Sequence, residues 1–178
     1  MAYQAMVTPF RNNSTLYEYG TYLALWVSAF EILVHKKPGD RVEWKNVCDF
    51  LGMHRWGTKR LRDKRFLLYK DKKKNKEIRG NLVQKLYKEL YDARCDFLHG
   101  NQVKVSHIYP FKNKNRPALG NLAPSIYWTA LSVFLPSEDE GNSVEAKGKS
   151  ILRGMMEIAY DEALLSSIGI KLEDIYNR

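Results

Sequence analysis

The sequence predicts an all-α fold, an up-and-down bundle of helices with additional short helices, in a single domain over residues 1–178. Apolar residues recur at spacings of three and four in several segments, which is typical of helices with one buried face. Residues that favour helices dominate, and the alternating pattern of strands is scarce. Because 44% of the 178 residues are hydrophobic, one hydrophobic core is expected.

The composition indicates which cellular compartment and which kinds of binding partner to expect. Two cysteines, Cys48 and Cys95, cannot supply a disulfide framework, so we expect a reducing, cytoplasmic environment. Residues 1–13 lack the layout of a secretory signal, and no apolar run in the sequence reaches the roughly 20 residues of a membrane span. The net charge of +9 favours anionic partners, although extra lysine also serves solubility.

The first predicted helix covers residues 15–36. Thr15 and Glu18 form the capping-box pattern that opens a helix. Its expected buried face holds Tyr19, Tyr22, Leu23, Trp26, Val27, Phe30, Leu33 and Val34. Glu31 lies on the flank of this face, either in a boundary salt bridge or as the partner of a basic residue near the Arg94 cleft. His35 is one turn away, but the sequence has no second pair to complete a metal site, so we predict no metal and no cofactor.

A turn at residues 37–39 leads to a shorter helix, for which Asp40 is the expected cap. This helix should run to Leu51 and end at Gly52. Its expected inward residues are Val42, Val47, Cys48 and Leu51. His54, just beyond the helix, is predicted to be a surface residue.

Residues 59–79 form a basic block. It holds eleven Lys or Arg and three Asp or Glu, a net charge of eleven minus three, or +8. The candidates for RNA contacts are Lys59, Arg60, Arg62, Lys64, Arg65, Lys72, Lys73 and Lys74. Residues 70–76 are predicted to be an exposed loop anchored by apolar residues 66–69. The block is either a solvated lysine surface or a tract that binds a phosphate backbone in a salt-dependent way.

The chain is organised around an amphipathic helix over residues 81–100. Asn81 is the expected N-cap and Gly100 the expected C′ residue. The apolar stripe contains Leu82, Val83, Leu86, Tyr87, Leu90, Tyr91, Phe97 and Leu98. Arg94 falls near the middle of this stripe, where a core helix would carry Leu or Ile. Because burying an unpaired guanidinium costs several kcal/mol, Arg94 requires a fixed anionic partner or a groove open to one.

Two more helices are predicted after an irregular stretch at residues 101–120, which adds four basic residues. Pro124 should open a helix to about Leu135. Its expected core residues are Tyr127, Trp128, Leu131 and Phe134. Asn142 or Ser143 should cap a long helix to about Ser166. Its expected inward residues are Ile151, Leu152, Met155, Met156, Ala159 and Leu164, and a short segment at residues 172–176 follows.

The segment LYKELYDARCDFLHGNQV, residues 86–103, carries an Arg-x4-His-Gly motif formed by Arg94, His99 and Gly100. In this motif the chain resembles the Apea-like branch of the HEPN superfamily, all-helical domains with an Arg-x(4–6)-His motif on a late helix. Residues 24–34, ALWVSAFEILV, resemble the first long helix of that branch around Glu31. The resemblance covers roughly residues 14–135. It implies a metal-independent endoribonuclease that works as a homodimer, in a defence or toxin setting with an inhibitor or antitoxin partner.

RNA can be cut without a metal when a base takes the 2′-OH proton, a cation stabilises the phosphorane and an acid protonates the leaving 5′-oxygen. Histidine suits proton transfer near neutral pH, and arginine binds phosphate as a permanently charged fork. From the resemblance, Arg94 holds the scissile phosphate, His99 transfers protons, and Glu31 and Asp96 are candidates to orient them. The expected product is a 2′,3′-cyclic phosphate.

One geometric difficulty accompanies this hypothesis. On a straight helix Arg94 and His99 point about 140° apart. They converge only if the helix end distorts or a second subunit contributes, and the resemblance favours a second subunit. We therefore predict a homodimer paired through the motif helix.

Two other interpretations remain open. In one, the domain binds RNA or another phosphate-bearing ligand without cleaving it. In the other, the motif helix is only the dimer interface of an interaction module. Arg94 would then be a buried ion pair with Glu31 or Asp96, and His99 a cation stabilised by the dipole of the helix C-terminus.

Overall fold

A computed structural model describes residues 2–3, 15–35, 37, 40–101, 103–133 and 144–170. These residues form a mostly helical protein with one two-stranded sheet, so the prediction of a helical fold is confirmed. The helices are α2 (Leu16–Val34), α3 (Trp44–Gly52), α4 (Lys59–Asp63), α5 (Leu82–Leu98), α6 (Leu119–Ser132) and α7 (Val144–Ile168). The strands are β1 (Phe66–Asp71) and β2 (Lys76–Gly80), and two short 3-10 helices, Val105–Ile108 and Pro110–Lys112, connect α5 to α6.

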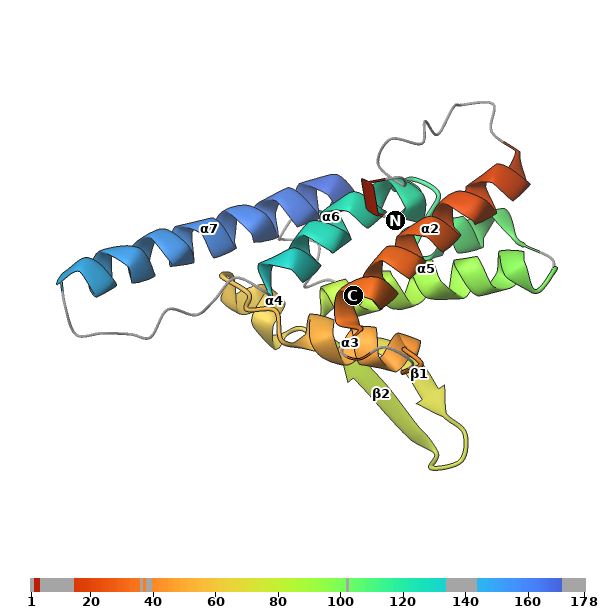
Figure 1. The fold of residues 1–178 in the computed structure, drawn as a ribbon, viewed down its shortest axis with the longest axis horizontal. Coiled ribbons are helices and arrows are strands. Elements are labelled where there is room, and N and C mark those ends of the chain that lie inside the picture. The colour runs from red at the N-terminus through yellow and green to blue at the C-terminus, as the bar shows by residue number, and fades with distance from the viewer. Residues whose placement is uncertain are drawn as a thin grey trace.

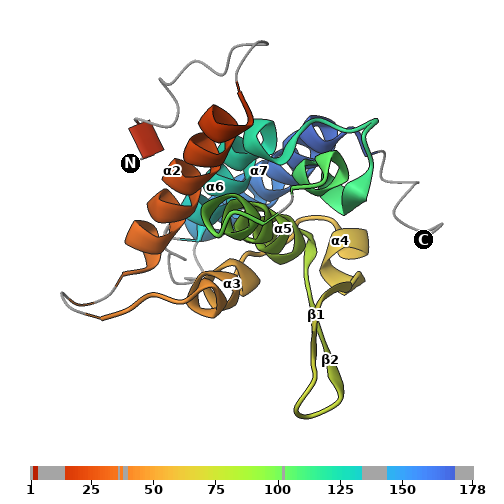
Figure 2. The same cartoon turned by 90° about the vertical axis from the view of Figure 1, so that its right-hand side faces the viewer.

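Helix α5 lies at the centre of the molecule and packs against α2, α3 and α6 (Figures 1 and 2). The rings of Trp26, Phe30, Tyr87 and Tyr127 form a connected group where α2, α5 and α6 meet. Around them the aliphatic side chains of α5 that were predicted to be buried are buried, from Leu82 to Leu90. The core is therefore built on the stripe that the helical spacing predicts.

Local sequence signals account for the ends of the two central helices. Thr15 and Glu18 form the predicted capping box at the start of α2. The Asn81 side chain caps α5 by accepting from the backbone N–H of Gln84, and the Gln84 side chain in turn accepts from the backbone N–H of Asn81. At the other end of α5, Gly100 adopts φ +64°, a conformation that favours glycine, so the predicted C′ residue is confirmed.

Several predicted boundaries were wrong. Helix α3 begins at Trp44 with Glu43 as its N-cap, so Asp40 does not open it. Helix α6 begins at Leu119, and Pro124 lies inside it.

Trp128 was predicted to be core but is 57% exposed, because it lies on the outer side of α6. The predicted Phe134, the caps at 142–143 and the segment 172–176 lie outside the described residues.

His54 was predicted to be at the surface and is buried. Its Nδ1 lies 3.1 Å from the hydroxyl of Ser132, and its Nε2 lies 3.8 Å from a carboxylate oxygen of Asp161 on α7. Asp161 is 1% exposed and also accepts a hydrogen bond of 2.8 Å from the backbone N–H of Thr58. Contacts with Ser132 and Asp161, 78 and 107 positions further along the chain, therefore accompany the burial of this histidine.

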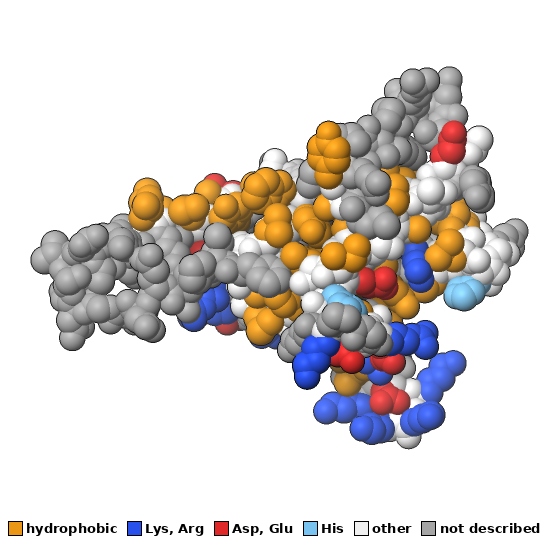
Figure 3. All heavy atoms as spheres, in the orientation of Figure 1, with side chains coloured by type: hydrophobic (Ala, Val, Ile, Leu, Met, Phe, Trp, Pro, Cys, Tyr) orange, Lys and Arg blue, Asp and Glu red, His pale blue; other side chains and the backbone are white. Residues whose placement is uncertain are grey.

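Helix α7 presents a mostly exposed face. Leu152, Met155, Met156 and Ala159 were predicted to point inward but are exposed, whereas Leu164 is buried as predicted. The apolar side chains of α7 are visible along the upper edge of Figure 3. None of the described helices combines the length and the apolar character that a membrane span requires.

The basic block contains a β-hairpin that the sequence analysis did not predict. Strands β1 and β2 pair antiparallel, and the hairpin projects from the helical body (Figure 2). The register shifts between Leu67 and Tyr69, which marks a bulge and interrupts the alternation that identifies a strand. Trp44 of α3 packs edge-on against Tyr69, with ring centroids 5.2 Å apart, and fixes the hairpin to the core.

Candidate functional site

Arg94 lines an open hollow of about 650 Å³ between α2, the segment before α3, and α5. Glu31, His35, Arg41 and Tyr91 line the same hollow. Glu31 belongs to α2 and Arg94 to the C-terminal part of α5, so the packing of these two helices brings the pair together. We call this the Arg94 hollow. It satisfies the requirement for a groove that the position of Arg94 in the apolar stripe implied.

The guanidinium of Arg94 is half-buried and only partly engaged. It lies 5.8 Å from the centroid of the Tyr91 ring, which is a cation–π contact. One terminal nitrogen is 4.0 Å from the sulfur of Cys95. Its buried Nε has no hydrogen-bond partner among the described residues. The Nε atom is buried and out of reach of a ligand, so the part of Arg94 that lines the hollow is what remains for an anion from outside the chain.

Among the described residues, Glu31 is the carboxylate that lines the hollow together with Arg94. Partial burial raises the pKa of Glu31 above its ordinary value, and the positive charge of Arg94 opposes that rise. The predicted neighbourhood of Glu31 and Arg94 is therefore present. No ion pair closer than 4.0 Å joins them among the described residues, so Arg94 is not held in a tight salt bridge.

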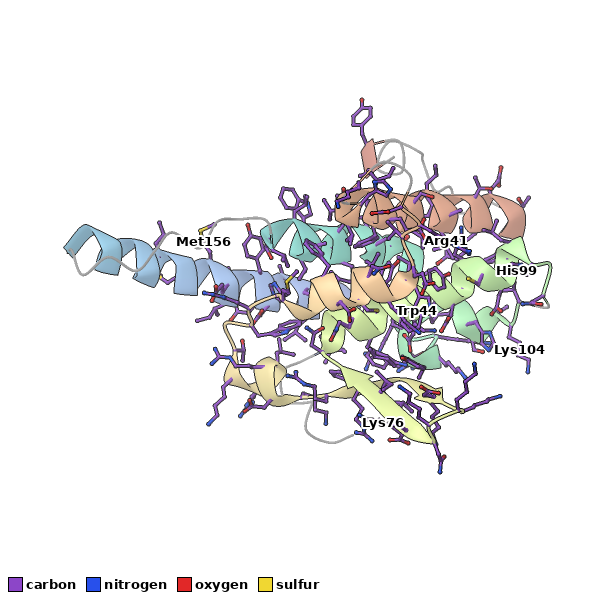
Figure 4. The ribbon with its side chains drawn as sticks, turned by 60° about the horizontal axis from the view of Figure 1, so that its bottom comes forward. Arg41, Trp44, Lys76, His99, Lys104 and Met156 are labelled. Carbon is purple, nitrogen blue, oxygen red and sulfur yellow. The ribbon has the colours of Figure 1, made fainter. Side chains whose placement is uncertain are left out.

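Arg41 and His35 complete the rim of the Arg94 hollow. Arg41 is exposed, and Figure 4 labels it beside the start of α3. The Nε2 atom of His35 lies 3.0 Å from the carbonyl oxygen of Asp40, and this contact orients the ring. Nothing in the sequence pattern singled out Arg41, because it lies in a connecting segment without a motif. With Arg94 and Arg41 against Glu31, the hollow has an excess of positive charge.

His99 lies outside the Arg94 hollow. It is the C-cap of α5 and is exposed, and Figure 4 shows it at the end of that helix. Helix α5 stays regular to Leu98, and the N–H of His99 still bonds to the carbonyl of Cys95 at 3.0 Å. The helix end is thus not distorted before Gly100. A single copy leaves Arg94 and His99 on different sides of the helix, as the i, i+5 spacing requires.

Asp96 was a candidate to orient Arg94 or His99, and it contacts neither in the described interactions. Its carboxylate lies 3.2 Å from Nδ1 of His107 and accepts a hydrogen bond of 3.3 Å from the Asn101 side chain. The sequence analysis gave His107 no role, because it stands in an irregular stretch. The pair Asp96–His107 joins the end of α5 to the first 3-10 helix, so its observed contacts stabilise the fold.

The basic block divides into two surfaces. Lys72, Lys73 and Lys74 are exposed at the tip of the hairpin, as expected for residues 70–76, although strands flank them. The carboxylate of Asp71 accepts from the backbone N–H groups of Lys73 and Lys74 and shapes this turn. Lys59, Arg60, Lys64 and the arginines near them lie on and after α4. Figure 3 shows Lys and Arg side chains gathered on the projecting hairpin.

No cluster of three or more His, Cys, Asp or Glu side chains suited to a metal occurs in the part of the chain that the structure describes. Burial raises the pKa of the Cys48 thiol to about 12, so this cysteine is a core residue and no nucleophile.

Comparisons with protein-family models, with curated proteins and with solved structures found no match. Any functional conclusion therefore depends on the residues themselves.

Proposed function

We propose that the protein is a metal-independent endoribonuclease that acts as a homodimer of HEPN-like helical bundles. The observation that supports this most directly is Arg94, a half-buried arginine on the wall of an open, positively charged hollow. Such a group can bind the scissile phosphate and stabilise the charge that develops on it. His99, exposed at the end of the same helix, is accessible to a second copy of the chain.

In this proposal Arg94 of one copy and His99 of the other meet at a composite site. One His99 takes the proton from the 2′-OH, and the 2′-oxygen attacks the phosphorus. The bond from phosphorus to the 5′-oxygen breaks, and the second copy's His99, in its protonated form, gives a proton to that oxygen. The products are a 2′,3′-cyclic phosphate and a 5′-hydroxyl. Arg41 adds positive charge beside the phosphate, and the basic hairpin contacts the RNA strand further away.

A second candidate is an RNA-binding domain that does not cleave. It is favoured by one observation, the separation of exposed His99 from the Arg94 hollow within a single copy. In that case the hollow and the lysines of the hairpin bind phosphates, and no proton transfer follows. A defence or toxin role, with an inhibitor or antitoxin that covers the hollow, is compatible with either candidate.

The first test incubates the protein with a mixed RNA substrate in EDTA and analyses the ends of any product. We expect the wild type to leave cyclic phosphate ends. Arg94→Ala and His99→Ala should each lower the rate about 100-fold or more. Lys45→Ala, an exposed charge change on α3, is the matched control and should cleave normally. Binding of RNA without cleavage by the wild type would favour the second candidate.

Mixing wild type with His99→Ala in equal amounts tests the composite site. Each cut in this proposal uses the His99 of both copies, so a mixed dimer is inactive. Random pairing makes about a quarter of the dimers wild type, so the mixture should keep about a quarter of the activity of the same amount of wild type. If each copy cuts RNA alone, the mixture keeps about half of that activity.

A further inference from the structure

A second hollow, of about 460 Å³, opens at the base of the hairpin and is lined by four arginines. Arg55 comes from the connection between α3 and α4, and Arg62 from α4. Arg65 precedes β1, and Arg79 belongs to β2. The chain thus brings four guanidinium groups to one concave surface from four separate segments. We call it the four-arginine pocket.

Two of these arginines are held by the backbone. Arg62 donates through Nη2 to the carbonyl of Trp56 at 2.9 Å. Arg65 donates through Nη1 to the carbonyl of Arg62 at 2.9 Å. Each guanidinium has five N–H donors, and one bond of this kind fixes its position while leaving others for a ligand. Pre-ordering of this sort lowers the entropy that binding would otherwise cost.

The charge balance of the pocket favours an anion with several charges. Among the described side chains that line the pocket, Glu157 is the one carboxylate, so the four arginines exceed it by four minus one, or three, positive charges before the pairing of Arg79 with Glu77 is counted. Outside the pocket, Arg79 also donates to one carboxylate oxygen of Glu77 at 3.0 Å. The Nζ of Lys70 lies 3.3 Å from the other oxygen of that carboxylate. The first residues of α5 form part of the wall, and the positive end of the helix dipole adds to the field.

We infer that the four-arginine pocket binds a chain of adjacent phosphate groups. Arginine forks match phosphate oxygens in pairs, and three excess positive charges suit a di- or triphosphate better than a single phosphodiester. The volume lies within the range of nucleotide-sized sites. The triphosphate can belong to a free nucleotide or to the 5′ end of an RNA, since both present the same chemistry.

This site is separate from the Arg94 hollow. The two hollows share no lining residue among those described. Gln84 borders the four-arginine pocket and Arg94 the other, ten residues further along α5, which corresponds to about 15 Å of helix. The inference therefore does not depend on RNA cleavage.

The test measures binding to the full chain by titration calorimetry at about 0.15 M salt, where non-specific attraction is screened. The probes are inorganic tripolyphosphate, ATP, and a short RNA with either a 5′-triphosphate or a 5′-hydroxyl. All proteins carry Arg94→Ala, so that cleavage cannot interfere. The pocket variant is Arg55→Gln with Arg79→Gln. The matched control, Lys45→Gln with Lys114→Gln, removes the same charge from two exposed positions outside the pocket and the hairpin.

We expect at least one triphosphate probe to bind. The pocket variant should weaken that binding about tenfold or more, and the control about twofold or less. Preference for ATP and tripolyphosphate identifies a free nucleotide as the source, and preference for 5′-triphosphate RNA over 5′-hydroxyl RNA identifies an RNA end. No binding by any triphosphate probe, or equal weakening in both variants, overturns the inference. Arg55→Gln alone, compared with Lys45→Gln alone, repeats the test if the double variant does not fold.

Discussion

The first residues of α5 are bonded to the core, whereas Leu98 and His99 at its end are exposed to solvent. At the start, the Asn81 side chain accepts from the N–H of Gln84 at 2.9 Å and donates to the carbonyl of Leu51 at 3.2 Å. Gln84 reaches in turn to the carbonyl of Cys48 at 2.7 Å. At the end, His99 is exposed and Leu98, predicted to be buried, is 53% exposed.

This difference shows how one helix can serve both stability and chemistry. At the start of α5 the side chains of Asn81 and Gln84 are bonded within the chain and hold α3 and α5 together, so the pocket they border depends on its arginines for bonds to a ligand. Further along, Arg94 lines the open hollow and His99 faces solvent. Substitutions near the start should therefore cost stability, and those near the end should affect function.

The largest effect is expected for Leu90→Ala. Leu90 is fully buried on the core side of α5, and removing its side chain should lower the free energy of unfolding by about 3 kcal/mol through lost burial and a cavity. Leu98→Ala, the same substitution at the exposed end, should cost less than about 0.5 kcal/mol. Urea denaturation of both variants measures the comparison. Equal losses would contradict the assignment of the end of α5 to the surface.

A smaller effect is expected for Asn81→Ala, which removes both the N-cap and the bond to Leu51. Loss of a cap together with a buried hydrogen bond should lower the free energy of unfolding by about 2 kcal/mol. Asn101→Ala, at the other end of α5, removes only an exposed bond to Asp96 and should cost less than about 0.5 kcal/mol. Thermal unfolding of the pair tests whether the two ends of the helix differ as described.

Gly20→Ala probes the contact that holds the last turn of α5. A Cβ at position 20 would lie 2.8 Å from Cγ of Phe97, so Phe97 or α2 must shift. Overpacking costs about 1–3 kcal/mol, and the helix preference of Ala returns about 0.5–1, so we expect a net loss of about 1 kcal/mol. Gly154→Ala on α7 is the control, because nothing lies within 4 Å of its added Cβ. It should be neutral or stabilising in urea denaturation.

Local signals predicted the start of α2, both ends of α5 and much of the core, but not the starts of α3 and α6. Thr15, Asn81 and Gly100 act at the positions that their side chains or backbone freedom predict, because capping involves residues three or four apart. The buried stripe of α5 followed from helical spacing for the same reason. These interactions are encoded within one turn of helix and need no knowledge of the fold.

Long-range contacts explain what was missed. The hairpin was hidden by its lysines and by the bulge near Leu67, and it is secured by Trp44, a residue from a different element. His54 is buried by Asp161, more than a hundred residues away. In the candidate site, the nearness of Glu31 to Arg94 was suggested only by the family resemblance, while Arg41 and the four-arginine pocket depend on how separate segments meet.

The smallest effect is expected for Glu31→Gln, and its sign depends on pH. Partial burial raises the pKa of Glu31, and Arg94 offsets part of that rise. The folded state therefore keeps the proton to a higher pH than the unfolded state, and wild-type stability falls as pH rises from the ordinary carboxyl range through the raised value. Glu31→Gln lacks this titration. Its Tm relative to wild type should increase with pH by about 1–2 °C, since a half-exposed carboxyl is well screened.

Arg94 decides how large that pH effect is. In an Arg94→Gln background the offsetting charge is gone, so the pKa of Glu31 should rise further and the gain from Glu31→Gln should grow. The same comparison at Glu43, an exposed carboxylate before α3, provides the control and should show no such dependence on position 94. If the Glu31→Gln effect is identical with and without Arg94, the two groups do not interact across the hollow. The Arg94 guanidinium would then lack the acidic neighbour that the candidate site assigns to it.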